Sequence, residues 1–223
     1  WEDIADRNDP KRIILTNRLW DNRNKNRKLY KELNALINHP GKSFNIKKGN
    51  INAILRTNGE AVILIDDERM EFSNWLDFAK YLCGGWFEEY TYQIIRPLFE
   101  KGLIKDLRIG MEISIKDQIV KKDKDWKDQL RNIHGQLYQE LDIVFSDGKS
   151  LYIVECKARR LKSGDIMKLQ NIVSHFGGAE GRGILISTYK TKSVIINRRV
   201  EEARNIELLS GQDLPRKLKD LVC

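Results

Sequence analysis

The order of helical and extended segments after residue 86 constrains the fold more than any other feature of the sequence. Residues 86–101 have the spacing of an amphipathic helix, and strand patterns follow it. The strand patterns cover 106–116, 137–145 and 150–158, and helix and strand then alternate over 164–176, 183–188, 192–204, 206–209 and 212–221. This order predicts an α/β fold, a mixed sheet with helices on both faces.

The part of the chain before residue 84 has a different pattern and predicts a small N-terminal helix and β-hairpin subdomain. Residues 22–38 are expected to form a helix. The apolar runs 51–55 and 61–65 predict a hairpin. Gly84-Gly85 interrupts the helix that follows, and the domain boundary is expected there. The two predicted domains are residues 1–83 and 84–223.

Positive charge is concentrated in the N-terminal part. The net charge of the chain is +8. Residues 11–56 hold twelve basic and two acidic residues, a net charge of +10, so the rest of the chain sums to −2. A basic block of this kind predicts a phosphate-binding surface, and a solvated basic face is the alternative. The residues expected to contact nucleic acid are Arg23, Lys25, Arg27 and Lys28.

Cysteine usage and hydropathy exclude several classes of protein. Three widely spaced cysteines predict no disulfide framework. No apolar run approaches the roughly 20 residues of a membrane span, and no signal segment opens the chain. We therefore expect a cytoplasmic protein with no membrane partner. Residue 1 is Trp rather than Met, which a fragment of a longer protein or a trimmed sequence would explain.

Acidic residues and a lysine are predicted to share one face of two neighbouring strands. Side chains alternate between the two faces of a strand, so Glu140 and Asp142 point the same way. On the next strand, Glu155 and Lys157 share a face for the same reason, while Cys156 points to the packed side. Three carboxylates beside a lysine, among strands rich in Ile and Val, are difficult to explain as packing.

The register of this hairpin decides how close the carboxylates lie. A turn centred on Asp147-Gly148 sets Glu140 opposite Glu155 and Asp142 opposite Ile153. Asp142 and Glu155 are then diagonal neighbours, about 7–8 Å apart. Carboxylates this close repel each other, and a bound Mg²⁺ or Mn²⁺ would resolve the repulsion because these ions prefer oxygen ligands. A solvated ladder of Glu and Lys is the alternative.

A further ligand is expected from the helix that begins at residue 86, where Glu88 and Glu89 compete. Glu88 falls near Ile95, at the edge of the buried side of the helix. Glu89 falls near Arg96, on the polar side. We therefore expect Glu88 to face the site, and Glu89 to pair with Arg96 or to face water.

Several polar residues that follow the second strand are weaker candidates. Arg159, Arg160 and Lys162 come directly after it, and they are expected to contact a nucleic-acid backbone or to form a solvated basic turn. On the next helix, Gln170 lies beside the apolar stripe and Lys168 opposite it, so Gln170 is the candidate that reaches the site.

Taken in order, these residues resemble the PD-(D/E)XK nuclease superfamily, whose pattern is a helical Glu, a strand Asp and a (D/E)-x-K strand. The matching residues are Glu88, Asp142 and Glu155-Cys156-Lys157. The Gly84–Tyr90 segment is similar to the nuclease half of CRISPR-associated ancillary nucleases that join a CARF sensor domain to a PD-(D/E)XK domain. The resemblance covers residues 84 to about 220 and departs from the motif at Leu141, where the proline of the motif's name is absent.

The resemblance implies a restriction-endonuclease-like core and a metal-dependent endonuclease that acts on DNA, RNA or both. Asp142 and Glu155 would be metal ligands, joined by the carbonyl of Cys156 and by Glu88. Lys157 would be the catalytic lysine. Candidates for additional roles are Glu89, Glu140 and Gln170.

The resemblance also implies partners. In that family, cyclic oligoadenylate binds the CARF domain of a dimer and activates the nuclease. The resemblance therefore implies a homodimer. The first 80 residues show no pattern of a CARF domain, so either the chain is a C-terminal fragment regulated through an upstream domain or its regulation differs. The alternatives are a nuclease of a restriction or DNA-repair system and a catalytically inactive nucleic-acid-binding module.

Overall fold

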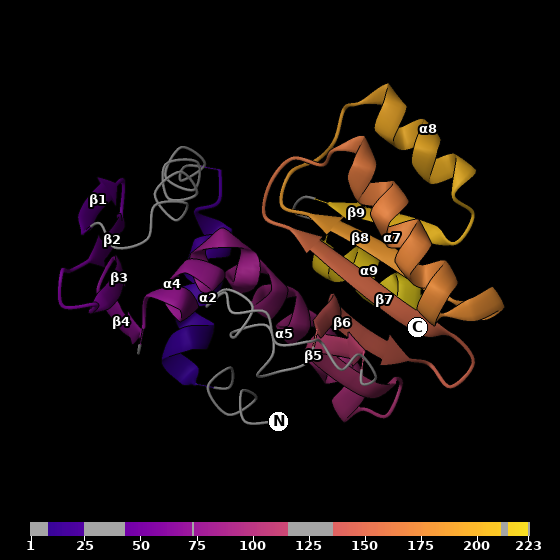
Figure 1. Ribbon diagram of the computed structural model, residues 1–223, viewed down its shortest axis with the longest axis horizontal. Coiled ribbons are helices and arrows are strands. Elements are labelled where there is room, and N and C mark those ends of the chain that lie inside the picture. The colour runs from indigo at the N-terminus through magenta and orange to yellow at the C-terminus, as the bar shows by residue number, and fades with distance from the viewer. Residues whose placement is uncertain (1–8, 25–42, 73, 116–135, 211–213, 223) are drawn as a thin grey trace, which may run out of the picture. The chain divides into compact units, whose positions relative to one another are not determined.

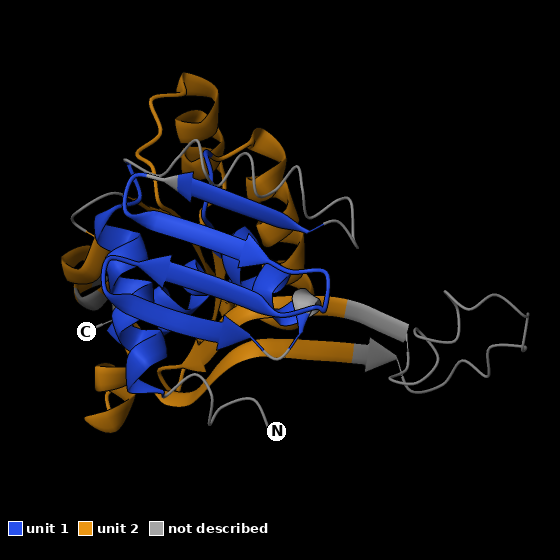
Figure 2. Cartoon of the chain, turned by 90° about the vertical axis from the view of Figure 1, so that its left-hand side faces the viewer, with its two compact units in different colours: residues 1–94, 156–160 blue, residues 95–155, 161–223 orange. Residues whose placement is uncertain are grey.

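The computed structural model describes residues 9–24, 43–72, 74–115, 136–210 and 214–222, and the chain divides into two compact units. The first unit comprises residues 1–94 and 156–160, and the second residues 95–155 and 161–223 (Figure 2). The division crosses helix α5 (Trp86–Glu100), so the predicted domain boundary after residue 83 stays a prediction. Within the described ranges, no helix has the length and apolar character that a membrane crossing requires.

Helix α2 (Pro10–Asp21) opens the described chain, and the sequence reasoning missed it. The carboxylate of Asp9 accepts the backbone N–H of Lys11 at 3.0 Å, and Pro10 occupies a first-turn position that needs no donor. This Asp-Pro start was a readable helix signal. The helix predicted over 22–38 falls mostly outside the described residues.

The first unit contains a four-stranded antiparallel sheet. Its strands are β1 (Phe44–Lys48), β2 (Ile51–Leu55), β3 (Ala61–Ile65) and β4 (Glu68–Phe72), in that order. The predicted hairpin is β2–β3, and the pairing of Leu55 with Ala61 confirms it. The sequence reasoning missed β1 and β4, because charged residues on edge strands, which discourage pairing with other chains, interrupt the apolar pattern.

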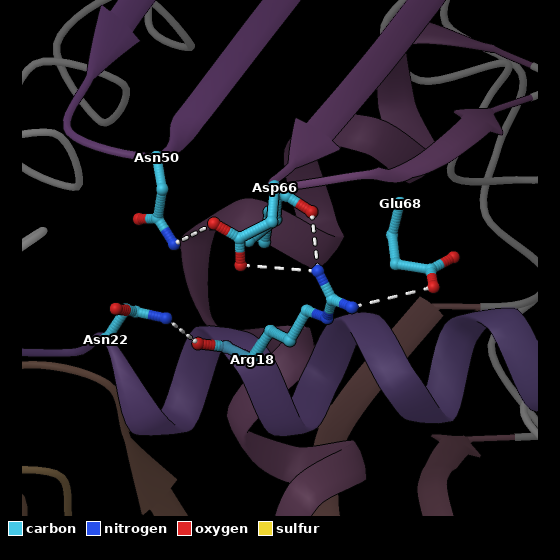
Figure 3. Close-up of polar contacts among 6 residues, drawn as sticks. Arg18, Asn22, Asn50, Asp66 and Glu68 are labelled. Atoms are coloured by element: carbon cyan, nitrogen blue, oxygen red, sulfur yellow. Dashed lines mark hydrogen bonds and ion pairs between the residues drawn. The ribbon is translucent and has the colours of Figure 1, made fainter.

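Arg18 fastens α2 to the turns of this sheet (Figure 3). Its Nη1 donates to the carbonyl of Ile65 at 3.1 Å and to Asp66 Oδ2 at 3.2 Å. Its Nη2 lies 3.7 Å from Glu68 Oε1, while Asn50 donates to the other Asp66 oxygen at 2.9 Å. Asp66 has a φ of 53°, and these contacts offset the strain of that conformation. Arg18, one of the basic residues of segment 11–56, therefore stabilises the fold.

The helical segment after β4 changes its winding once. Helix α4 (Trp75–Lys80) begins at Asn74, whose side chain accepts the backbone N–H of Asp77 at 3.0 Å. A π-helical turn, η1 (Tyr81–Gly85), then leads into α5. Gly84 leaves helical geometry, with φ 172° and ψ −28°, and marks the kink at the predicted glycine break. This kink sets the direction in which the first turn of α5 presents its glutamates.

The second unit contains a five-stranded mixed sheet (Figure 1). β5 pairs with β6 and β6 with β7 in antiparallel fashion, whereas β8 and β9 are parallel. All five strands lie where the sequence predicts them, and the predicted mixed α/β fold is confirmed. The strands are β5 (Lys105–Ile115), β6 (Gln136–Ser146), β7 (Leu151–Lys157), β8 (Arg182–Ser187) and β9 (Ile206–Ser210).

Helices α7 (Ser163–Phe176), α8 (Val194–Glu202) and α9 (Leu214–Val222) belong to the second unit. Val144 of β6 and Ile153 of β7 are buried in one cluster with Leu169 and Val173 of α7. α7 therefore packs against the part of the sheet that carries the predicted acidic residues.

Candidate functional site

The pairing of β6 with β7 brings Asp142 and Glu155 together. The observed register pairs Ile143 with Val154. Asp142 precedes Ile143 and Glu155 follows Val154, so an extension of this antiparallel register by one step sets them opposite each other on one face. Residues directly opposite have Cβ atoms about 4.5–5.5 Å apart. The hairpin therefore forms a pair of neighbouring carboxylates.

The predicted register of this hairpin is wrong by two residues. The prediction sets Asp142 opposite Ile153, whereas Ile153 pairs with Val144. Because the shift is even, the predicted face of each side chain is kept. Asp142 and Glu155 become direct neighbours instead of diagonal ones, which suits a shared ligand better.

The turn between the two strands explains the shift. Asp147 Oδ1 accepts the backbone N–H of Ser150 at 2.7 Å and of Lys149 at 2.8 Å. These bonds hold Ser150 in the loop, and the strands close with the pairing of Ser146 and Leu151. The same N–H groups, with that of Ser150 the stronger influence, hold the pKa of Asp147 below its ordinary value.

Glu155 is deeply buried and contacts a lysine from α7. Its residue exposure is 2%, and Lys168 Nζ lies 3.1 Å from Glu155 Oε1. The lysine side chain is 51% exposed. A buried carboxylate is costly without a counter-charge, and Lys168 supplies a counter-charge to Glu155.

The sequence reasoning missed Lys168. It favoured Gln170, which is exposed and whose role stays a prediction. Asp165 is buried on the same helix, so the buried stripe is wider than its apolar residues alone indicate. Lys168 then lies at the flank of this stripe, and its long stem lets the ammonium reach the sheet.

The remaining strand residues lie as alternation requires. Cys156 is buried, in agreement with a side chain on the packed face, and Asp142 and Lys157 are half-buried. Lys157 follows Glu155 by two residues on β7 and shares its face. The assignment of Lys157 as the catalytic lysine, and of the Cys156 carbonyl as a ligand, stays a prediction.

Glu140 lies further along β6, and its neighbour is on β5. It is exposed and pairs with Glu112, so two like charges are opposite each other at this edge of the site. The prediction that Glu140 is opposite Glu155 is wrong, because the β6–β7 register pairs Ile153 with Val144. On β5, Ile109 pairs with Ile143 and Met111 pairs with Leu141. Gly110, with a φ of 61°, lies between these two residues, at the position opposite Asp142. A glycine there leaves the Asp142 side chain without a bulky cross-strand neighbour.

Glu89 does not have the predicted environment. It is 5% exposed, and Arg12 Nε donates to its two carboxylate oxygens at 3.0 and 2.9 Å. Arg96 pairs with Glu100 instead, at 2.7 Å. The apolar periodicity of α5 did not reveal this pair, because its partner comes from the missed helix α2.

Glu88 is the half-buried member of the glutamate pair. Glu88 lies one helical turn after the kink at Gly84, and a Cβ added at Gly84 would lie 3.7 Å from Glu88 Oε1. Arg12 binds the Glu89 carboxylate, and the assignment of Glu88 as a ligand stays a prediction. Asp142 and Glu155 belong to the second unit.

The donor chemistry of the hairpin fits a hard divalent cation. Carboxylate oxygens are the ligands that Mg²⁺ and Mn²⁺ prefer, and Asp142 and Glu155 supply them from adjacent strands. In the described part of the chain, no group of three His, Cys, Asp or Glu side chains has metal-binding geometry. The role of Asp142 and Glu155 as metal ligands therefore stays a prediction.

The predicted phosphate-binding surface needs one correction. Arg23 is 6% exposed, and its Nη1 donates to the backbone carbonyl of Trp20 at 2.7 Å. Its Cζ lies 3.8 Å from the centroid of the Trp20 ring. Because it is buried, it is not a surface contact for nucleic acid. Lys25, Arg27 and Lys28 lie outside the described residues. After β7, Arg159, Arg160 and Lys162 are exposed, as a contact with a nucleic-acid backbone would require.

Comparison with known families identifies the class of domain to which this fold belongs. Residues 77–223 match the family described as Card1-like, endonuclease domain. This match covers more than half of the chain, so the chain belongs to the Card1-like endonuclease domain family. A comparison with curated proteins finds no match.

Two solved structures share the fold of the chain. Can2 from Sulfobacillus thermosulfidooxidans, determined in complex with cyclic tetra-adenylate, has a TM-score of 0.61 and 19% identity, over 96% of this chain and 56% of that one. Protein VC1899 from Vibrio cholerae has a TM-score of 0.63 and 16% identity, over 95% and 55%. This chain therefore spans little more than half the length of either protein.

Proposed function

We propose that this endonuclease domain is metal-dependent and that Asp142 and Glu155 form the centre of its site. The observation that carries the proposal is the β6–β7 register, which sets the two carboxylates opposite each other, with Lys157 on the same face of β7. Carboxylate pairs of this kind repel unless a cation neutralises them. A bound cation of this kind can also activate water at neutral pH, which a hydrolytic reaction can use.

In the proposed site, Asp142 and Glu155 hold Mg²⁺ or Mn²⁺, and Glu88 and the carbonyl of Cys156 complete the protein ligands. The bound cation supplies a water of lowered pKa and offsets charge on the scissile phosphate. The ammonium of Lys157 donates to a phosphate oxygen or to the attacking water, and so stabilises the charge that develops during hydrolysis. Arg159, Arg160 and Lys162 hold the nucleic-acid backbone without reading its sequence.

We further propose that the domain is an effector of CRISPR antiviral defence and that cyclic oligoadenylate regulates it through a sensor domain upstream. The Can2 structure, which contains cyclic tetra-adenylate, supports this proposal because its fold is shared and its chain is much longer. A homodimer is expected, because a cyclic activator built from repeated units suits an assembly with two-fold symmetry.

A cleavage assay with Glu155→Gln tests the catalytic proposal. Wild type and variant are mixed with single- and double-stranded DNA and RNA, in Mn²⁺, Mg²⁺ or EDTA, with and without cyclic tetra-adenylate. Cutting should require metal and be lost in the variant, because the amide is a neutral and weaker ligand. Glu207→Gln, an exposed position on β9, is the matched control and should cut normally.

The other outcomes separate the competing functions. Cutting that ignores cyclic tetra-adenylate, in this chain and in the full-length gene product, would argue for a restriction or repair nuclease. Nucleic-acid binding with no cutting by the full-length product would leave an inactive binding module. Metal-independent cutting that survives Glu155→Gln would overturn the site itself.

A further inference from the structure

The contact between Lys168 and Glu155 lies at the atoms that the proposed cation would need. Lys168 Nζ is 3.1 Å from Glu155 Oε1, and the carboxylate is 2% exposed. A buried carboxylate has few ways to be solvated, so the ammonium supplies a positive charge that would otherwise come from elsewhere. The ammonium and a divalent cation are therefore candidates for the same oxygen.

The two partners of this ion pair differ in their freedom to move. Glu155 lies on a central strand of the sheet, between β6 and β8. Lys168 lies on α7, and its side chain is 51% exposed, so the ammonium can leave the carboxylate and reach water at low cost. Asp165 and Leu169, its neighbours on α7, are buried and hold the helix in place. Only the end of the lysine side chain has to rearrange.

We propose that Lys168 acts as a positioning residue that substitutes for the cation: it holds the Glu155 carboxylate in the metal-free domain and is displaced when a divalent ion binds. This inference rests on the proposed metal-dependent function. The displaced ammonium stays within one side-chain length of the site, where a phosphate oxygen of the substrate is an equivalent partner. The pair thus offsets the charge of Glu155 until metal and substrate arrive together.

The proposal makes a prediction that a permanent ion pair does not make. If Lys168 competes with the cation, its removal should tighten metal binding. If Lys168 instead held Glu155 in a geometry that the metal needs, its removal should weaken metal binding. If the pair persisted in both states, loss of the ammonium would change metal affinity only by relieving its repulsion of the cation. The direction of the change in Kd separates competition from support, and the Tm of the variant in saturating Mn²⁺ separates competition from a persistent pair.

The test measures Mn²⁺ binding by isothermal titration calorimetry and thermal unfolding with and without Mn²⁺. Lys168→Met keeps the length of the stem and removes the charge. We expect its Kd for Mn²⁺ to fall about fivefold, the size expected for an ion pair with one half-exposed partner. Its Tm should be lower than that of wild type without metal and equal to it with saturating Mn²⁺. Asn171→Met, exposed on the same helix, should change neither quantity.

Glu155→Gln separates the inference from the function on which it rests. This variant should lose Mn²⁺ binding at the site. If it binds Mn²⁺ like wild type, the proposed metal site is wrong. If it loses binding but Lys168→Met has an unchanged or higher Kd, or a Tm deficit that persists in saturating Mn²⁺, the metal site stands and the role proposed for Lys168 is overturned. Lys168→Arg keeps the charge and should not bind Mn²⁺ more tightly than wild type.

Discussion

Arg12 of α2 and Glu89 of α5 form a charged pair in which Nε lies 3.0 and 2.9 Å from the two carboxylate oxygens. The same guanidinium lies 4.8 Å from the ring centroid of Tyr81, whose hydroxyl is 2.9 Å from Thr16 Oγ1. Burial raises the pKa of Tyr81, which stays neutral in this network. α2 lies outside the family match over 77–223, yet it is fastened to the first turn of α5, next to Glu88.

Removing one partner of this pair should destabilise the chain strongly. Arg12→Met leaves the Glu89 carboxylate buried without its counter-charge, and we expect a loss of about 3–5 kcal/mol in the free energy of unfolding. Replacing both residues, as in Arg12→Met with Glu89→Met, should recover most of that loss, because no buried charge remains. Urea denaturation followed by circular dichroism measures both effects.

A matched control is available on the same helix. Arg96 and Glu100 are also paired, at 2.7 Å, but their side chains are 40% and 55% exposed. Arg96→Met should therefore cost less than about 1 kcal/mol. Equal losses for Arg12→Met and Arg96→Met would contradict the importance given to burial.

Lys157→Met should separate catalysis from metal binding. In the proposed site, the lysine touches phosphate or water and is not a ligand, so Mn²⁺ affinity should remain while the cleavage rate falls about 10²–10³-fold. Single-turnover cleavage and calorimetry measure the two quantities. Lys149→Met, exposed in the β6–β7 turn, is the control and should leave both unchanged. A large loss of Mn²⁺ affinity in Lys157→Met would assign the lysine a structural role.

Gly183 is required where β8 approaches α7 and β9. A Cβ at this position would lie 2.3 Å from Ile206 Cδ1, 3.0 Å from Val173 Cγ2 and 3.2 Å from Leu169 Cδ2. Gly183→Ala should cost about 1–3 kcal/mol through overpacking. Ile206→Val removes the closest atom, so the double variant should be more stable than Gly183→Ala alone. Denaturation of the four proteins in this cycle measures the coupling, and strict additivity would argue against the clash.

The Asp147 turn should make stability depend on acid pH. Its folded pKa is lowered, chiefly by the backbone N–H of Ser150 and then by that of Lys149. The stabilisation is therefore present above the unfolded pKa and is lost as pH falls through the lowered folded pKa. Wild type should be more stable than Asp147→Asn at pH 6, and the difference should shrink as the pH falls below the ordinary range of an aspartate. Urea denaturation at a series of pH values measures this, and a constant difference would contradict the assignment.

The face on which Asp142 and Glu155 lie was predictable, and their register was not. Alternation depends on the strand alone, so it assigns both carboxylates to one side of the hairpin. The register depends on the turn, where Asp147 holds the N–H of Ser150 in a side-chain bond that competes with the strand ladder. Several turn types are compatible with the sequence Ser-Asp-Gly-Lys, so the sequence alone does not determine which turn forms.

Long-range partners account for the remaining differences. The burial of Glu89 depends on Arg12, and the role of Lys168 depends on the depth of Glu155 in the sheet. Periodicity within one helix cannot show a charge supplied by another element. The five strands of the second unit were predictable because their own apolar pattern decides where each begins and ends.

The hairpin that carries Asp142 and Glu155 also has a consequence for the order of folding. Its two strands are adjacent in the chain, and hairpins of this kind form within about 1–10 μs. Lys168 belongs to the segment that follows, so during synthesis the acidic pair leaves the ribosome before its counter-charge. Until α7 docks, the nascent hairpin therefore has Lys157 but not Lys168 to offset the repulsion between its carboxylates. We expect divalent ions in the surrounding solution to speed this early step, even for a variant that can no longer cut nucleic acid.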